Sequence, residues 1–202
     1  MNLSDFTRFY ENVLTDTECD SVIKYYNEQQ EADAFIIDEN GEPSVSSTTR
    51  KSKFVQVERD SLTDLLLYSA IQKIIEAYVK HLSSFKLEGS ELTLLSNLPQ
   101  DVETAPYLIN KYDEGGFYDW HTDQGYGSDM DLEITSRMIS ILIYLNDDFE
   151  GGLTELPFGH FVPKKGCAAV FPSDWKFPHR STPITKGKKY SIATWLKPKS
   201  VV

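Results

Sequence analysis

The sequence is short of cysteine, of long apolar runs and of positive charge. Its 202 residues include only two cysteines, Cys19 and Cys167, which is too few for a disulfide framework. We expect both to be free, packed thiols in a reducing, cytoplasmic setting. No segment is apolar over the roughly 20 residues that a membrane-spanning helix needs. The first residues, MNLSDFTRFYENVL, lack the basic and then apolar pattern of a secretory leader.

The scarcity of positive charge restricts the partners. Lysine and arginine total 20 against 31 aspartate and glutamate residues, a formal net charge of −11. This balance argues against nucleic acid as the main partner, because phosphate binding needs clusters of lysine and arginine. The simplest interpretation is that the acidity keeps the protein in solution. A basic peptide substrate is the alternative. The sequence predicts no oligomeric state.

The patterns indicate one domain over 1–202, with a helical support region at 1–90 and a strand-rich core at 91–198. Residues 5–14 are expected to form a short strand, followed by a helix capped by Thr15 or Asp16 and ending near Gln29. Residues 30–50 are predicted to be a loop and 51–57 a strand. A longer helix follows, with His81 near its end, where a cation is favourable. Its apolar face is predicted from Leu62, Leu65, Leu66, Ala70, Ile71, Ile74, Ile75 and Tyr78.

The second half changes to short β-rich runs separated by glycine-containing turns. Strands are expected at 91–96, 105–112, 117–123, 137–145, 153–156, 167–172 and 189–196. Many short strands of this kind favour a sandwich or a jelly roll. The fold class is therefore predicted as α+β, a double-stranded β-helix (jelly roll) with the N-terminal helices packed on one sheet.

Three side chains suggest a metal site. If 121–123 is extended, His121 and Asp123 point the same way, because side chains two apart on a strand share a face. Alone, such a triplet could be a surface turn. His179 would be a loop histidine by itself. Together, two histidines and one carboxylate fit the facial triad that leaves open positions on a non-haem iron.

A fourth residue fits a dicarboxylic ligand. Alternation along 189–196 places Lys189, Ser191 and Ala193 on one face and Lys188, Tyr190 and Ile192 on the other. A lysine on the metal side could pair with the far carboxylate of such a ligand, although a lysine in a KGKK run is usually solvated.

The order of several motifs over roughly 105–197 resembles the prolyl 4-hydroxylase-like branch of the Fe(II)/2-oxoglutarate-dependent oxygenases. Tyr112, Gly115-Gly116 and Tyr118 precede His-x-Asp at 121–123. Arg137 and the run Tyr144-Leu145-Asn146 follow. After these come Gly151-Gly152, Pro163-Lys-Lys-Gly166 and an apolar run at 168–171. The pattern ends with His179, Pro183-Ile184, Gly187-Lys-Lys-Tyr190 and Trp195.

The resemblance implies a role for each matching residue. His121, Asp123 and His179 would bind Fe(II). Lys189 and Tyr144 would hold the C5 carboxylate of 2-oxoglutarate, with Tyr112 in the same pocket. Arg137 would contact substrate, and Trp195 and Ile141 would line the site. The implied co-substrates are 2-oxoglutarate and O2, with ascorbate as a further cofactor. The implied substrate is a peptidyl proline in a peptide or protein.

Other interpretations remain open at this stage. A metal-dependent hydrolase could use the same ligands, but it would need an activated water and a general base. A non-catalytic jelly-roll binding module is the third possibility. His160 is expected to lie outside the metal site and Cys167 to pack in the core. The segments 32–50 and 124–136 could form a flexible cover over the substrate.

Overall fold

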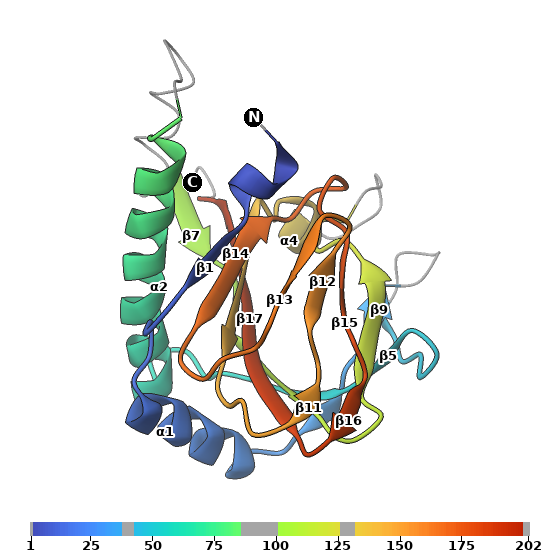
Figure 1. Ribbon diagram of the computed structural model, residues 1–202. Coiled ribbons are helices and arrows are strands. Elements are labelled where there is room, and N and C mark those ends of the chain that lie inside the picture. Colours follow the sequence, from blue (N-terminus) through green and yellow to red (C-terminus); the bar gives the residue numbers. More distant parts are fainter. Residues whose placement is uncertain (1, 38–42, 86–100, 126–131, 200–202) are drawn as a thin grey trace.

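The computed structural model describes residues 2–37, 43–85, 101–125 and 132–199. Two antiparallel sheets face each other, and helices α1 and α2 lie along the outer side of the larger sheet (Figure 1). From β8 onward the chain passes back and forth between the sheets. This arrangement confirms the predicted jelly roll. Among the described residues, no helix is long and apolar enough to cross a membrane.

The larger sheet has the strand order β1-β14-β10-β17-β8-β6-β2, and β7 pairs with the far end of β17. In chain order its strands are β1 (Arg8–Tyr10), β2 (Ala32–Asp33), β6 (Lys53–Gln56), β7 (Val102–Thr104), β8 (Leu108–Tyr112), β10 (Ile139–Tyr144), β14 (Ala168–Pro172) and β17 (Lys189–Pro198). The central position of β17, between β10 and β8, carries Lys189 and Trp195 into the middle of the fold.

The smaller sheet has the strand order β13-β12-β15-β9-β5. Its strands are β5 (Arg50–Lys51), β9 (Phe117–His121), β12 (Thr154–Leu156), β13 (Gly159–Phe161) and β15 (His179–Ser181). Two short pairs accompany the sheets, β3 (Ile36–Ile37) with β4 (Pro43–Ser44) and β11 (Glu150–Gly151) with β16 (Ile184–Lys186). His179, expected in a loop, therefore belongs to a strand, and that strand is only three residues long.

The helical elements are η1 (Leu3–Phe6), α1 (Asp16–Asn27), α2 (Leu62–Leu82) and α4 (Leu132–Thr135). Thr15 caps α1: its hydroxyl accepts from the Glu18 backbone N–H, and the Glu18 carboxylate accepts from the Thr15 N–H at 2.7 Å. This reciprocal arrangement satisfies two backbone donors. The predicted start of the helix at Thr15 or Asp16 is confirmed.

Helix α2 buries one stripe against the larger sheet. Ile71 and Ile74 of α2 belong to the same buried cluster as Ile141 of β10 and Ile192 of β17. The expected stripe was too long at its beginning, because Leu62 and Leu65 are 87% and 56% exposed. At 3.6 residues per turn, Leu62 and Leu65 lie on the side of the helix opposite the fully buried Leu67 and therefore face away from the core. His81 makes structural contacts, with Nδ1 bonded to Arg8 and Nε2 to the Asp5 carbonyl, each at 2.7 Å.

The first 60 residues contribute strands to both sheets as well as helices. β1 and β6 fall within the segments 5–14 and 51–57, where strands were predicted. β2 falls within 30–50, which was expected to be a loop, and β5 begins at the last residue of that segment. The strands begin well before residue 91, so the expected division into a helical part and a strand part is too sharp. The strand expected at 91–96 lies outside the described residues. So do residues 38–42 and 126–131, which belong to the two segments, 32–50 and 124–136, that were expected to cover the substrate.

Candidate metal centre and its cavity

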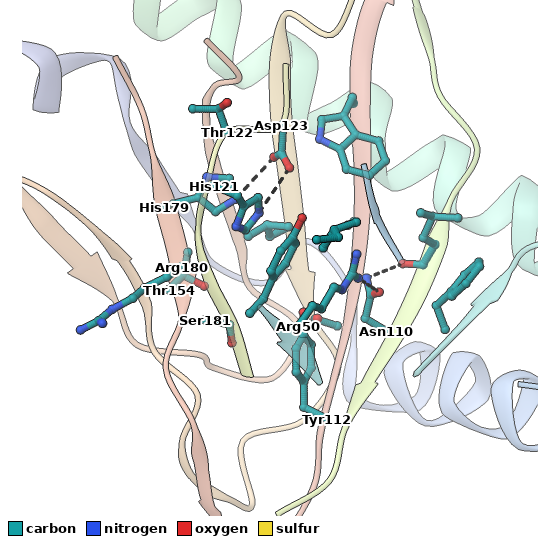
Figure 2. A pocket seen from close by; sticks show the side chains of 18 of the residues that line it. Arg50, Asn110, Tyr112, His121, Thr122, Asp123, Thr154, His179, Arg180 and Ser181 are labelled. Carbon is teal, nitrogen blue, oxygen red and sulfur yellow. Dashed lines mark hydrogen bonds and ion pairs between the residues drawn. The ribbon is translucent and has the colours of Figure 1, made fainter. Parts of the chain in front are cut away.

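Strand pairing brings the two histidines together. His121, the last residue of β9, lies directly opposite His179, the first residue of β15, and the centroids of the two rings are 4.3 Å apart. Asp123 follows β9 by two residues. Its carboxylate lies 3.7 Å from His121 Nε2 through Oδ1 and 3.5 Å from His179 Nε2 through Oδ2. One potential ligand atom from each residue falls within 4.8 Å of the others, and Figure 2 shows the three side chains converging.

The surrounding contacts leave the right atoms available for a metal ion. The Nδ1 atom of His121 is 2.7 Å from the Asp119 carbonyl and that of His179 is 3.3 Å from the Phe177 carbonyl. An Nδ1–H that donates to a carbonyl leaves the Nε2 lone pair unprotonated. On Asp123, Oδ2 accepts a 2.6 Å hydrogen bond from the Ser140 hydroxyl. The donor set, two imidazole nitrogens and one carboxylate, therefore fits Fe(II).

Electrostatics support the same protonation states. Burial, followed by the nearby His179, lowers the pKa of His121 to about 3, so this imidazole is neutral at pH 7. Burial alone would raise the pKa of Asp123. The adjacent histidines and the Ser140 hydrogen bond outweigh it and lower this pKa to about 2. A neutral imidazole beside an ionised carboxylate is the state that binds a divalent cation.

The three residues open into a cavity of about 410 Å³ that also contains Lys189. Lys189 is 2% exposed. Its ammonium group donates to the Gly152 carbonyl at 2.7 Å and to the Ser181 hydroxyl at 3.1 Å. No carboxylate among the described residues pairs with it, and burial lowers its pKa to about 7. A buried cation with only neutral partners is costly, and a carboxylate in the cavity would compensate it.

Gly152 shapes this end of the cavity. Its φ of +64° is favourable for glycine, and a Cβ there would lie 2.6 Å from Ile184 Cδ1 and 3.1 Å from Lys189 Cδ. The absence of a side chain thus lets the backbone approach the lysine closely enough for the hydrogen bond to the Gly152 carbonyl.

Two tyrosines flank the ammonium group. The rings of Tyr112 and Tyr144 lie 5.4 and 5.5 Å from Lys189 Nζ, distances at which an aromatic face attracts a cation. The Tyr144 hydroxyl donates to Thr154 Oγ1 at 2.8 Å, and burial raises the pKa of Tyr144. Both tyrosines therefore lie beside Lys189, as predicted, although the Tyr144 hydroxyl is hydrogen-bonded to a threonine.

Arg137 and Trp195 form another part of the wall. The Arg137 guanidinium stacks 3.6 Å from the Trp195 ring centre, and its Nη1 donates to the Asp123 backbone carbonyl at 3.3 Å. The Trp195 indole N–H is buried without a hydrogen-bond partner among the described residues. These contacts place both side chains next to the metal ligands, in the cavity where substrate contacts were expected.

The expectation that Ile141 lines the site is wrong. Ile141 is fully buried in the cluster shared with α2, whereas Leu142 lines the cavity. Successive side chains on β10 point to opposite faces, so the residues in register with Tyr144 are Leu142 and Ser140. The same alternation on β17 was predicted correctly, with Lys189, Ser191, Ala193 and Trp195 all lining the cavity.

Three further wall residues had no assigned role in the sequence analysis, namely Arg50, Tyr118 and Asn110. The Tyr118 ring stacks on His121 with centroids 3.5 Å apart. These residues are three apart and still share a face, because the register between β9 and β15 shifts by one residue between their two pairs. Such a bulge turns a side chain to the other face. No pattern in the sequence predicts this register shift. Arg50, likewise, reaches the site only because β5 pairs with β9.

His160 and the two cysteines lie outside the metal site. His160 lies on β13 at the edge of the smaller sheet, opposite Glu155, and outside the three-residue cluster. Both cysteines are buried free thiols. Among the described wall residues, Asp123 is the only carboxylate, so the cavity offers a metal centre and several cations but no separate carboxylate base.

Comparisons with known proteins agree with this geometry. The model of the 2OG-Fe(II) oxygenase superfamily matches residues 107–197. A PKHD-type hydroxylase from Alteromonas mediterranea is 26% identical over 137 residues, covering 64% of this chain and 56% of the relative. Prolyl 4-hydroxylase 2 from Arabidopsis thaliana is 24% identical, covering 93% of this chain and 65% of the relative. The chain thus spans between about half and two thirds of the length of these relatives.

A solved structure shares the fold. It is a prolyl hydroxylase in complex with a hypoxia inducible factor oxygen degradation domain peptide fragment from Trichoplax adhaerens. The TM-score is 0.68 at 16% identity, and the match covers 97% of this chain and 85% of the other.

Proposed function

We propose that this chain, which belongs to the prolyl 4-hydroxylase-like branch of the 2OG-Fe(II) oxygenase superfamily, acts over its whole length as one dioxygenase domain that hydroxylates a proline in a peptide. The observation that carries the proposal is the convergence of His121, Asp123 and His179 in the same cavity as the buried, uncompensated Lys189. The first three match a facial metal triad, and the fourth matches a dicarboxylic co-substrate.

Each residue has a defined task in this proposal. Fe(II) held by the triad would supply the oxidation, in which 2-oxoglutarate, O2 and a substrate C–H bond give succinate, CO2 and the hydroxylated substrate. Ser140 holds the Asp123 carboxylate in place through its 2.6 Å hydrogen bond. Asp119 and Phe177 orient the two imidazoles through their carbonyls. Ascorbate would keep the iron reduced.

Lys189 would anchor the C5 carboxylate of 2-oxoglutarate. The ammonium group already donates to Gly152 and Ser181, so it retains one N–H of its three for a ligand. The flanking rings of Tyr112 and Tyr144 exclude water from this end of the cavity. A charge-assisted hydrogen bond is stronger in such a place than in water. The Tyr144 hydroxyl would contribute to the same carboxylate by turning from Thr154.

The substrate assignment rests on the relatives. The relatives and the solved structure described above include prolyl hydroxylases, one of which holds a peptide. The aromatic and cationic part of the cavity wall formed by Tyr118, Trp195 and Arg137 provides surface for a small ring and for peptide carbonyl groups. A hydrolase would need a general base, and Asp123, the one carboxylate in the described wall, is a metal ligand.

The test is succinate formation from 2-oxoglutarate by the purified protein with Fe(II) and ascorbate under air, with and without proline-containing peptides. We expect peptide-stimulated turnover that is lost in Asp123→Ala and Lys189→Ala and retained in His160→Ala, which removes a histidine outside the cavity. If 2-oxoglutarate neither binds to the iron-loaded protein nor is consumed, the oxygenase proposal is wrong and a binding module becomes the better explanation.

A further inference from the structure

The side chain of Arg50 is held in the cavity wall by hydrogen bonds, and it has no counter-ion among the residues that the structure describes. Its guanidinium lies 4.4 Å from the centre of the Tyr118 ring, and that ring stacks on His121. Nε donates to Ser52 Oγ at 3.0 Å, Nη1 to the Phe35 carbonyl at 3.2 Å and Nη2 to Asn110 Oδ1 at 2.8 Å. Figure 2 shows Arg50 beside Asn110, on the opposite side of the cavity from Arg180. All these partners are uncharged.

The unused donors of Arg50 have a defined geometry. A guanidinium carries five N–H groups in one plane. Three are used, so one N–H on each of Nη1 and Nη2 has no partner among the described residues. Two such groups match the two oxygens of a carboxylate. Because the side chain is already immobilised, little conformational entropy is lost when a ligand binds.

The neighbouring charges do not compensate Arg50. Lys53 and Lys111, the sequence neighbours of its partners Ser52 and Asn110, share the Glu31 carboxylate. Arg180, also in the cavity wall, is paired with Glu155 at 2.6 Å. The one wall carboxylate, Asp123, faces the two histidines. Lys189 lies at a separate position between Tyr112 and Tyr144, where the proposed co-substrate binds. Among the described residues, therefore, no carboxylate compensates the positive charge of Arg50 beside the metal centre.

We infer that the substrate carries a carboxylate close to the carbon that is hydroxylated, and that Arg50 binds it. The inference deepens the proposed function and rests on it. In a peptide the carboxylate would belong to an aspartate or glutamate within about two residues of the proline, because each extended residue spans roughly 3.3 Å. The alternative source of the same chemistry is the α-carboxylate of a C-terminal or free proline.

The test compares matched substrates on the wild-type, Fe(II)- and 2-oxoglutarate-loaded protein. One series places glutamate or glutamine at each of the two positions before and after proline in peptides with blocked ends. A second series compares a C-terminal proline with its amide, and L-proline with L-prolinamide. We expect kcat/KM for hydroxylated product to be at least about tenfold higher for the acid than for the amide in one series, as loss of a charge-assisted hydrogen bond predicts. The series that responds identifies the source of the carboxylate.

Variants then assign the preference to Arg50. In Arg50→Gln the acid and the amide should react equally well, and in Arg50→Lys part of the preference should remain, because the charge is kept and the planar pair of donors is lost. Lys51→Gln is the matched control: it removes the exposed neighbouring cation, which does not line this cavity, and the preference should persist. The ratio of acid to amide is the readout, so a general loss of activity does not affect it.

Calorimetry on the Mn(II)-loaded protein separates the two proposals. If 2-oxoglutarate does not bind to the wild type, the proposed function fails. If it binds and no substrate series distinguishes acid from amide, the function stands and the inference about Arg50 is overturned. A weaker affinity for 2-oxoglutarate in Arg50→Gln would assign Arg50 to the co-substrate and would also overturn the inference.

Discussion

The affinity for 2-oxoglutarate should depend on pH in a way that Lys189 sets. Burial lowers the pKa of this ammonium group to about 7 in the protein without ligand. Only the protonated form attracts a carboxylate, and 2-oxoglutarate keeps both carboxylates ionised above pH 6. Binding therefore takes up a proton once the pH exceeds about 7. The affinity for 2-oxoglutarate should therefore fall as the pH rises, because deprotonation of Lys189 removes the form that binds the carboxylate.

The size of the effect follows from the same pKa. The apparent Kd of a ligand that requires one proton rises about tenfold for each pH unit above that pKa, so it should increase roughly 50-fold between pH 7 and pH 9. With an ordinary lysine pKa of about 10.4, the Kd would hardly change over that interval. The burial of Lys189 and the absence of a carboxylate partner among the described residues are the structural origin of the difference.

Isothermal titration calorimetry of 2-oxoglutarate on the Mn(II)-loaded protein, in buffers from pH 6.5 to 9.5, measures this dependence. Lys189→Arg is the matched control, because a guanidinium stays protonated throughout, and its Kd should be independent of pH. In Lys189→Met the ligand should bind weakly at every pH. A wild-type Kd that stays constant from pH 7 to 9 would refute the reasoning, either because the ammonium group is not dehydrated or because it does not contact the ligand.

Three further predictions concern other parts of the site. Ser140→Ala removes the hydrogen bond to Asp123 and should lower metal affinity about 10–100-fold, measured by competition with a chelator, with the urea midpoint as the folding control. Ile141→Ala should cost roughly 2–5 kcal/mol of stability, as for other buried residues, and should leave the KM for peptide unchanged. Leu142→Ala, in the cavity wall, should raise that KM. Denaturation measures the first effect and steady-state kinetics the second. Gly152→Ala places a Cβ 2.6 Å from Ile184 and should weaken 2-oxoglutarate binding, while Gly159→Ala, where a Cβ meets no atom within 4 Å, should not.

The parts of the site that the sequence predicts depend on local geometry. The two-residue spacing of His121 and Asp123 puts their functional groups in the same place, because an extended backbone presents alternate side chains to one side. The same rule selected Lys189 over Lys188 on β17. Both arguments use only neighbours in sequence, which is why they transfer directly to the structure.

The parts that the sequence did not predict depend on pairing between distant segments. Arg50 reaches the cavity because β5 pairs with β9, about 70 residues away along the chain. The shifted register that turns Tyr118 toward His121 is a property of two strands together. Ile141 was assigned to the wrong face for a related reason. The run 139–143 is apolar at nearly every position, because β10 is buried on both sides, and an unbroken apolar run does not identify which face points to the cavity.

The described cavity wall is mainly cationic, whereas the chain as a whole carries a negative net charge. The net charge of −11 was compatible with a basic peptide. Among the described residues, however, the wall around the metal centre carries Arg50, Arg137, Arg180 and Lys189, and its single carboxylate is Asp123. One of these cations is neutralised by Glu155, and the bound co-substrate would neutralise another. Attraction acts over roughly 8–10 Å at physiological ionic strength, so the groups lining the cavity, more than distant surface acids, determine which substrate is stable there. An acidic chain with a cationic cavity is therefore expected to favour a substrate whose negative charge lies beside the reacting carbon.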